Sequence, residues 1–262
     1  MDQPPALEPQ SATPPLASMS LAARLANVIA APGDVFDEVK SARASMANWL
    51  VPATLFIAIG WIGAVLVFSQ PALQHQMNDV AEKNIEKQIQ KQHLTKEQAE
   101  QARQKGVQFA GIFSKVGAVA APVFAGILTP IWWGLILWLV GAKIFKGNFL
   151  FLKGVEVAGL ANMVGVLGAV LKILLVLVTG NLFATPSLAL LAKDFDPQNP
   201  VHGLLAVVNV MTFWYLWVAA IGLARLGSVS FVKAAAWVFG IWASYTGLMV
   251  AVGFALQAVF AK

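Results

Sequence analysis

The chain alternates between long apolar runs without charged residues and shorter polar segments. Four runs hold no Asp, Glu, Lys or Arg: 49–68, 116–142, 198–224 and 234–261. A fifth apolar run, between Glu156 and Lys193, contains a single charge at Lys172. Each run is longer than about 18 residues, the length that indicates a membrane-spanning helix. We therefore predict an all-α integral membrane protein with five transmembrane helices, at about 49–68, 116–140, 155–178, 201–223 and 234–260.

Composition supports this class of protein. Charged residues make up 12% of the chain, about half of their share in soluble domains. The strands of a membrane β-barrel would alternate polar and apolar residues in segments of about ten, and no such alternation is present. The net charge of +5 is spread over segments beside the spans, as expected for contact with lipid head groups. The lipid bilayer is therefore the expected partner, and nucleic acid is not.

Three polar regions lie before and between the first two spans. Residues 1–17 hold five prolines and little to bury, which predicts a disordered tail. Residues 18–47 predict two short amphipathic helices, capped by Ser18 or Ser20 and separated at Pro32-Gly33. These helices could lie on the membrane surface or pack under the helix bundle. The membrane domain is then 48–262.

The insert at 70–115 is rich in Gln, Glu and Lys, which favour helix. Apolar residues recur every four positions from Leu73 to Ile89, and Thr95 and Gln98 have the spacing of a capping box. We predict a helical hairpin outside the bilayer that turns near His93-Leu94 and extends the first two spans. It could be an arm for interaction with a partner or a solvated connector.

Positive charges give a modest signal for orientation. The N-terminal side of the predicted bundle carries eight Lys and Arg residues, against two on the other side, or nine if the hairpin is counted. The eight are Arg24, Lys40, Arg43, Lys143, Lys146, Lys153, Arg225 and Lys233. Charges close to the spans determine orientation, and a folded segment can be translocated whatever its charge. This favours a multi-pass protein of the cell inner membrane with a cytoplasmic N-terminus.

The third span carries the most informative side chains. An intramembrane ionisable residue is by default a candidate functional residue, and Lys172 is one. Six residues recur at intervals of four and three and therefore share one narrow helix face, on which small side chains allow another helix to approach closely. They are Gly154, Ala158, Ala161, Gly165, Gly168 and Lys172.

Three environments are open for Lys172. Its ammonium could snorkel to the membrane interface, pair with a buried group, or contact an ion or substrate. Glu156 lies near the start of the same helix, where the helix dipole favours a carboxylate. Because it is on the opposite membrane edge and about 160° around the helix, it cannot pair with Lys172.

Motifs for catalysis are missing from the sequence. HExxH, P-loop and GxSxG patterns do not occur, and His75, His93 and His202 are scattered. The chain has no cysteine, which excludes thiolate metal sites and a Cys nucleophile. We expect no catalytic residue, no metal site and no cofactor.

Several short motifs resemble bacterial members of the Yip-one (Ypt-interacting protein) family over roughly residues 20–260. They are PGDVF at 32–36, WLVP at 49–52, LTKEQ at 94–98, KIFKGNF at 143–149, VEVAGLA at 155–161, WVAAIG at 217–222 and SFVKA at 230–234. The resemblance implies a five-helix membrane bundle with a cytosolic N-terminus. Eukaryotic relatives bind Rab-type GTPases, but their Asp-Leu-Tyr-Gly-Pro motif is absent ahead of Trp49, so that role is not carried over. No functional residue is transferred.

Two functions follow as expectations. The first is a non-enzymatic membrane protein that organises the membrane or binds a partner, either a membrane protein or a second copy of itself. The alternative is a small-solute or ion transporter or channel that uses Lys172 and the Pro-kinked second span. Transport predicts that the polar residues within the spans converge on one cavity. These residues are Asn162, Lys172, Asn209, Tyr215, Tyr245 and Gln257.

Overall fold

The computed structural model describes residues 19–92, 94–193, 195–197 and 199–260, with side chains as far as residue 255. The predicted tail at 1–17 and the predicted turn residue His93 lie outside these ranges. Within them the chain is helical and forms no strand beyond one isolated bridge. Five helices are long and apolar enough to cross a membrane, which confirms the predicted class. They are α3 (Ala47–Phe68), α5 (Lys96–Trp138), α6 (Phe151–Thr179), α8 (Val210–Gly227) and α9 (Phe231–Phe260).

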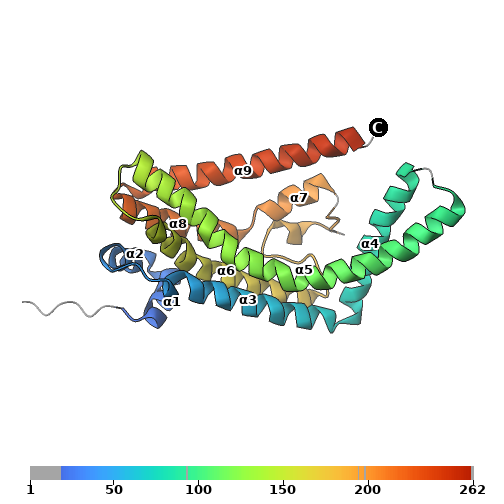
Figure 1. Ribbon diagram of the computed structural model, residues 1–262, viewed down its shortest axis with the longest axis horizontal. Coiled ribbons are helices and arrows are strands. Elements are labelled where there is room, and N and C mark those ends of the chain that lie inside the picture. Colours follow the sequence, from blue (N-terminus) through green and yellow to red (C-terminus); the bar gives the residue numbers. More distant parts are fainter. Residues whose placement is uncertain (1–18, 93, 194, 198, 261–262) are drawn as a thin grey trace, which may run out of the picture.

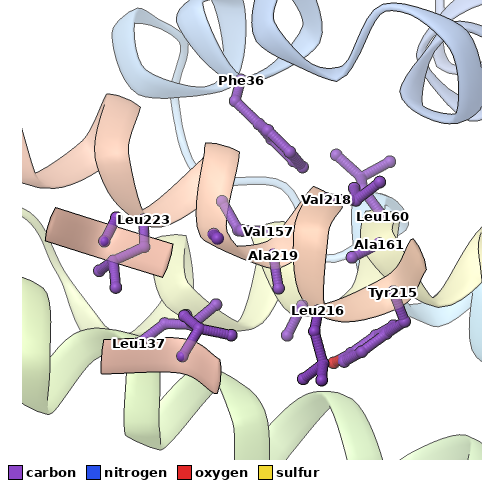
Figure 2. Packing of buried hydrophobic residues seen from close by; sticks show 14 of the residues in the cluster. Phe36, Leu137, Val157, Leu160, Ala161, Tyr215, Leu216, Val218, Ala219 and Leu223 are labelled. Carbon is purple, nitrogen blue, oxygen red and sulfur yellow. The ribbon is translucent and has the colours of Figure 1, made fainter. Parts of the chain in front are cut away.

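Helix α6 is the centre of the bundle. It packs against α3, α5 and α8, and α8 in turn contacts α9 (Figure 1). Leu160 of α6 and Leu216 and Leu223 of α8 are completely buried in the resulting core (Figure 2). Helix α6 ends at Gly180, whose φ of 61° suits a left-handed C-cap, as the Thr179-Gly180 sequence predicts.

Close contacts at two glycines bring α6 against its neighbours. A Cβ atom at Gly159 would lie 2.2 Å from Cβ and 2.4 Å from Cα of Trp49 on α3. A Cβ atom at Gly154 would lie 2.5 Å from the carbonyl oxygen of Gly134 on α5. The backbones of α3 and α5 therefore approach α6 more closely than any side chain would permit.

The two N-terminal helices, α1 (Leu21–Ala30) and α2 (Pro32–Ser41), pack against the end of the bundle. Ser20 caps α1 by accepting a hydrogen bond from the Ala23 N–H group. Val28 is completely buried, and so is Phe36, which points between α6 and α8 (Figure 2). The apolar faces of both helices therefore pack on protein.

The insert between the first two spans forms a hairpin arm, residues 71–115. Helix α4 (Pro71–Gln92) runs outward, and the first part of α5 runs back and continues into the membrane span without interruption (Figure 1). The predicted capping box at Thr95 and Gln98 is formed. The arm extends from the end of the bundle opposite to α1 and α2.

Helix α5 ends in a π-helical turn, η1 (Leu139–Ile144). The fourth span is shorter than the predicted helix at 201–223 and begins later. Helix α7 (Pro200–Val207) stops, and α8 starts at Val210 after a break at Val208-Asn209. The side-chain oxygen of Asn209 accepts hydrogen bonds from the N–H groups of Met211 and Thr212, and this cap starts a new helix. The segment before α7 includes the short 3₁₀ helix η2 (Leu188–Leu191).

The last span, α9, packs on α8 through its first half, as far as Trp242, and also contacts α7. Ala234 and Val238 are buried in the core that α8 helps to form, while later side chains such as Tyr245 and Leu248 are exposed. A Cβ atom added at Gly240 or Gly247 would meet no other atom within 4 Å. In a bilayer, lipid or another protein must cover this helix.

Candidate functional site

A buried polar network connects α1 and α2 to the start of α6 and α3. We call it the N-terminal network and define it by Arg24, Glu38, Asn48, Lys153 and Glu156. The Glu156 carboxylate accepts hydrogen bonds from the Ser45 N–H group at 2.6 Å and from the Asn48 side chain at 3.0 Å. Its cationic neighbour, the Lys153 ammonium, lies 3.5 Å away.

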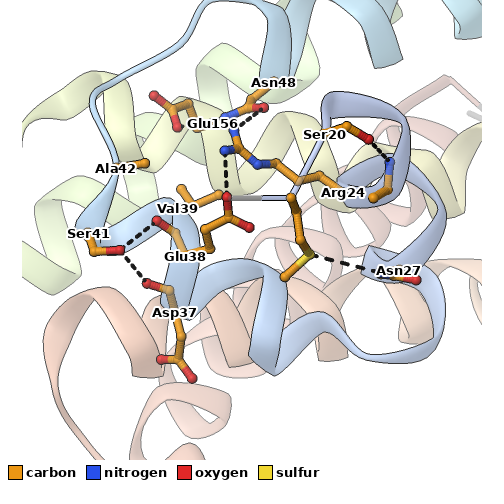
Figure 3. Close-up of polar contacts among 12 residues, drawn as sticks. Ser20, Arg24, Asn27, Asp37, Glu38, Val39, Ser41, Ala42, Asn48 and Glu156 are labelled. Carbon is orange, nitrogen blue, oxygen red and sulfur yellow. Dashed lines mark hydrogen bonds and ion pairs between the residues drawn. The ribbon is translucent and has the colours of Figure 1, made fainter. Parts of the chain in front are cut away.

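Arg24 extends the network into the N-terminal helices. Its guanidinium donates to Glu38 at 2.8 Å and to the Asn48 side-chain oxygen at 3.3 Å (Figure 3). Lys153 donates to the carbonyl oxygens of Val39 and Ala42 at 2.6 and 2.8 Å. The network thus fixes the end of α2 and the segment that leads to α3. Its charges are compensated inside the protein, as buried charges must be.

The burial of Lys153 corrects its role in the orientation argument. It was counted among eight charges beside the spans, but its side chain is only 9% exposed and is paired with Glu156, which is fully buried. Its ammonium therefore faces groups inside the protein and not the lipid head groups. Arg24 of the same network is likewise paired, with Glu38, so six of the eight Lys and Arg residues counted on that side lie outside the network. As predicted, Glu156 does not pair with Lys172.

The six-residue face of α6 meets two different neighbours. Gly154 touches the backbone of α5, and Ala158 and Ala161 are completely buried. The other three members, Gly165, Gly168 and Lys172, line a cavity of about 370 Å³. A Cβ atom added at Gly168 would lie 3.2 Å from the Met211 side chain of α8.

This cavity, which we call the α6 cavity, collects four of the six intramembrane polar residues named from the sequence. Asn162, Lys172, Asn209 and Tyr215 all line it. Of the other two, Tyr245 lies on α9 in a separate shallow groove, and the side chain of Gln257 is outside the described residues. The four residues are distant in sequence, so only the packing of α8 on α6 brings them together.

Two side chains on the floor of the α6 cavity have buried polar atoms without hydrogen-bond partners. They are the amide nitrogen of Asn162 and the hydroxyl oxygen of Tyr215, on side chains of residues only 5% and 8% exposed. The Tyr215 ring is packed edge-on against Trp133 at 5.9 Å, which fixes its direction. Lys172 is exposed and therefore lies at the mouth of the cavity.

No ion pair or hydrogen bond to Lys172 is present within the described part of the chain. The lysine therefore has neither the buried partner that was one alternative nor a contact that would restrict its ammonium. It can reach the membrane interface or a molecule bound in the cavity.

Sequence reasoning missed most of the N-terminal network. Arg24 had been assigned only as a flanking positive charge, and Glu38 and Asn48 had no assigned role. The one available signal was an acidic and a basic residue three positions apart, Lys153 and Glu156, at the start of an apolar helix. Such spacing permits an ion pair on a helix but does not reveal that α2 covers it.

No group of three or more His, Cys, Asp or Glu side chains in the described residues is arranged to hold a metal ion. The architecture is that of an all-α, multi-pass membrane protein with a central helix and two packed N-terminal helices. The sequence profile of the Yip1 domain matches residues 26–255, most of the chain. The protein therefore belongs to the Yip1 domain family. No curated protein and no solved structure matches the chain.

Proposed function

We propose that this Yip1-domain protein is a non-enzymatic membrane scaffold that binds a partner through its hairpin arm. We place it in the cell inner membrane with its N-terminus in the cytoplasm. The arm would then lie on the opposite side of the membrane from α1 and α2. The partner would be another membrane protein or a second copy of the chain.

The surface of the arm carries the proposal. Among the residues of 71–92 and 94–115, only Leu73 is buried, although the two helices form a defined hairpin. Ile85 occupies the space above Gly106, and an ion pair joins Glu86 to Arg103 at 3.3 Å. The base is attached to the bundle because the Gln76 side chain donates to the Gly180 carbonyl at 2.7 Å and accepts from the Leu182 N–H group at 3.0 Å. An arm ordered at its base but exposed along its length is suited to contact another molecule.

Site-specific crosslinking in cells tests this proposal. A photo-crosslinking residue at Gln101, exposed on the arm, should give one adduct of defined mass, whereas one at Leu248 on α9 should give mainly lipid adducts. Gly106→Leu should remove the arm adduct, because a side chain there meets Ile85 at 2.7 Å. Gly111→Leu is the matched control, since nothing lies within 4 Å of its Cβ position.

Adducts that are equally strong from both crosslinker positions would contradict the arm proposal. Recovery of no stoichiometric partner after purification in mild detergent would also count against it. Reporter fusions at residues 10 and 262 test the orientation, and a cytoplasmic C-terminus would refute it.

A small-solute or ion transporter or channel is the second candidate function. The convergence of Asn162, Lys172, Asn209 and Tyr215 on one cavity favours it, since transport requires a polar path through the bundle. The pure protein reconstituted in liposomes should then pass a small ion, and Lys172→Met should abolish that flux. If neither anions nor cations pass, the transporter or channel function is refuted and the scaffold function remains.

A further inference from the structure

We propose that the α6 cavity is a binding site for a phosphate-type oxyanion. The site lies between α6, α5 and the start of α8, with Lys172 at its mouth and Asn162 and Tyr215 at its floor. It is separate from the hairpin arm, so the proposal does not depend on the scaffold function. Its ligand would be the phosphate group of a membrane lipid or a free phosphate ion.

The sign of the ligand follows from the lining residues. Among the described residues that line the cavity, Lys172 is the one charged residue and none is a carboxylate. A cation would therefore meet repulsion and no counter-ion, whereas an anion would meet an ammonium that has no partner within the described residues. Lysine is a common ligand of phosphate in proteins, acting as a compact positive charge.

The floor of the cavity supplies hydrogen-bond donors. The Asn162 amide nitrogen and the Tyr215 hydroxyl are both buried and unpaired. A buried polar group without a partner costs about 1–3 kcal/mol. Asn162 lies ten residues before Lys172 on α6, about 15 Å deeper along the helix axis. The phosphate would therefore contact Lys172, and the ester oxygens of the same lipid would accept from the floor groups and recover that free energy. The N–H groups of Met211 and Thr212 at the start of α8 are already bonded to Asn209 and are not available.

The apolar part of the lining favours a lipid as the source of the phosphate. Phe56, Trp133 and Met211 line the cavity beside the polar residues and would cover the glycerol and acyl portions of a lipid. Lys172 lies 21 residues after the start of α6, about 32 Å along the helix axis and so at the far edge of the hydrocarbon core. Lipid phosphates lie at that depth.

Native mass spectrometry of the full chain in detergent tests the site. We expect dioleoylphosphatidylglycerol to bind at least about tenfold more tightly than dioleoylglycerol, which lacks the phosphate. Lys172→Gln should remove that difference. Lys193→Gln should retain it, because Lys193 is an exposed lysine between the third and fourth spans that does not line the cavity.

Tyr215→Phe separates ligand binding from folding. Removal of an unpaired buried hydroxyl should leave the unfolding temperature unchanged or raise it, while phosphatidylglycerol binding weakens several-fold. A role in packing alone would not give this opposite pair of effects. Inorganic phosphate is added in a parallel titration: a rise in unfolding temperature that depends on Lys172 would assign the site to a free ion, and a lipid-specific effect would assign it to a lipid. Equal losses in Lys172→Gln and Lys193→Gln, or no preference for the phosphate-bearing lipid, would overturn the proposal.

Discussion

Removing one partner of the Lys153–Glu156 pair should destabilise the protein at least as much as removing both. The carboxylate of Glu156 is fully buried, and Lys153 is 9% exposed with its ammonium 3.5 Å away. In Lys153→Met the carboxylate keeps two neutral donors but loses its counter-ion. In Glu156→Gln the ammonium keeps the carbonyls of Val39 and Ala42 and loses its counter-ion.

An uncompensated buried charge costs about 3–5 kcal/mol, and each single variant should lose that much free energy of unfolding. The double variant buries no charge and orphans only neutral groups. We expect it to be no less stable than either single variant, so that the two substitutions are non-additive by about 3 kcal/mol. A pair of exposed residues on the arm, Arg103 and Glu86, should show a coupling below about 1 kcal/mol.

Reversible unfolding in mixed dodecylmaltoside and dodecyl sulfate micelles, followed by tryptophan fluorescence, measures these values. Trypsin supplies a local readout, because the exposed Arg43 lies in the segment that Lys153 and Glu156 hold through Ala42 and Ser45. Cleavage there should be faster in both single variants. Additive effects of the two substitutions, or a loss below about 1 kcal/mol in Lys153→Met, would refute the assignment of a buried, coupled pair.

Two further substitutions test the packing around α6. Gly159→Ala should cost about 1–3 kcal/mol, because its Cβ atom would lie 2.4 Å from the backbone of Trp49, while Gly240→Ala on α9 should be neutral in the same unfolding assay. Equal effects would show that α3 can move away from α6. Arg24→Met should lower the free energy of unfolding by about 2–4 kcal/mol, because Glu38, whose side chain is 16% exposed, then loses its counter-ion. Proteolysis of α1 should become faster, and unchanged proteolysis would contradict the assignment.

The membrane spans could be predicted from sequence because the signal is local. A run of about 18 residues without charge is sufficient evidence by itself, and each of the five predicted spans overlaps a long apolar helix. The arm was predictable for the same reason, from helix-forming composition and a capping box at Thr95. These features depend on neighbours in the chain and not on the fold.

The N-terminal network could not be predicted because its contacts are distant in sequence. Ser45 and Glu156 are separated by 111 positions, and each looks ordinary in its own segment. The apolar faces of α1 and α2 gave a similar ambiguity. From the sequence, Phe36 and Val28 could be buried in lipid or against protein. Their burial against protein follows from the shape of the α6 and α8 surface, which the sequence does not reveal.

The break between α7 and α8 is the least expected feature of the fold. No proline or glycine lies between Gly203 and Gly222, so a continuous helix was the simplest prediction. In the structure the helix is interrupted at Val208-Asn209 instead, and side-chain and backbone contacts with the segment before α7 hold this break in place. The Val210 N–H group donates to the Pro186 carbonyl at 3.1 Å, and the Leu188 N–H group donates to the Val208 carbonyl at 3.1 Å. Asn209 provides the only local signal, as a residue that favours helix N-caps.

Asn209→Ala tests whether this break shapes the α6 cavity. Loss of the cap leaves two N–H groups without the Asn209 oxygen and should cost about 0.5–2 kcal/mol. Asn199→Ala is a matched control, because Asn199 caps α7 in the same way through the Val201 N–H group but does not line the cavity. Both variants should therefore lose similar stability, whereas only Asn209→Ala should weaken phosphatidylglycerol binding. If both variants bind the lipid as tightly as the parent protein, the Asn209 cap does not shape the site, and the α8 residues that line the cavity are held in place by packing on α6 instead.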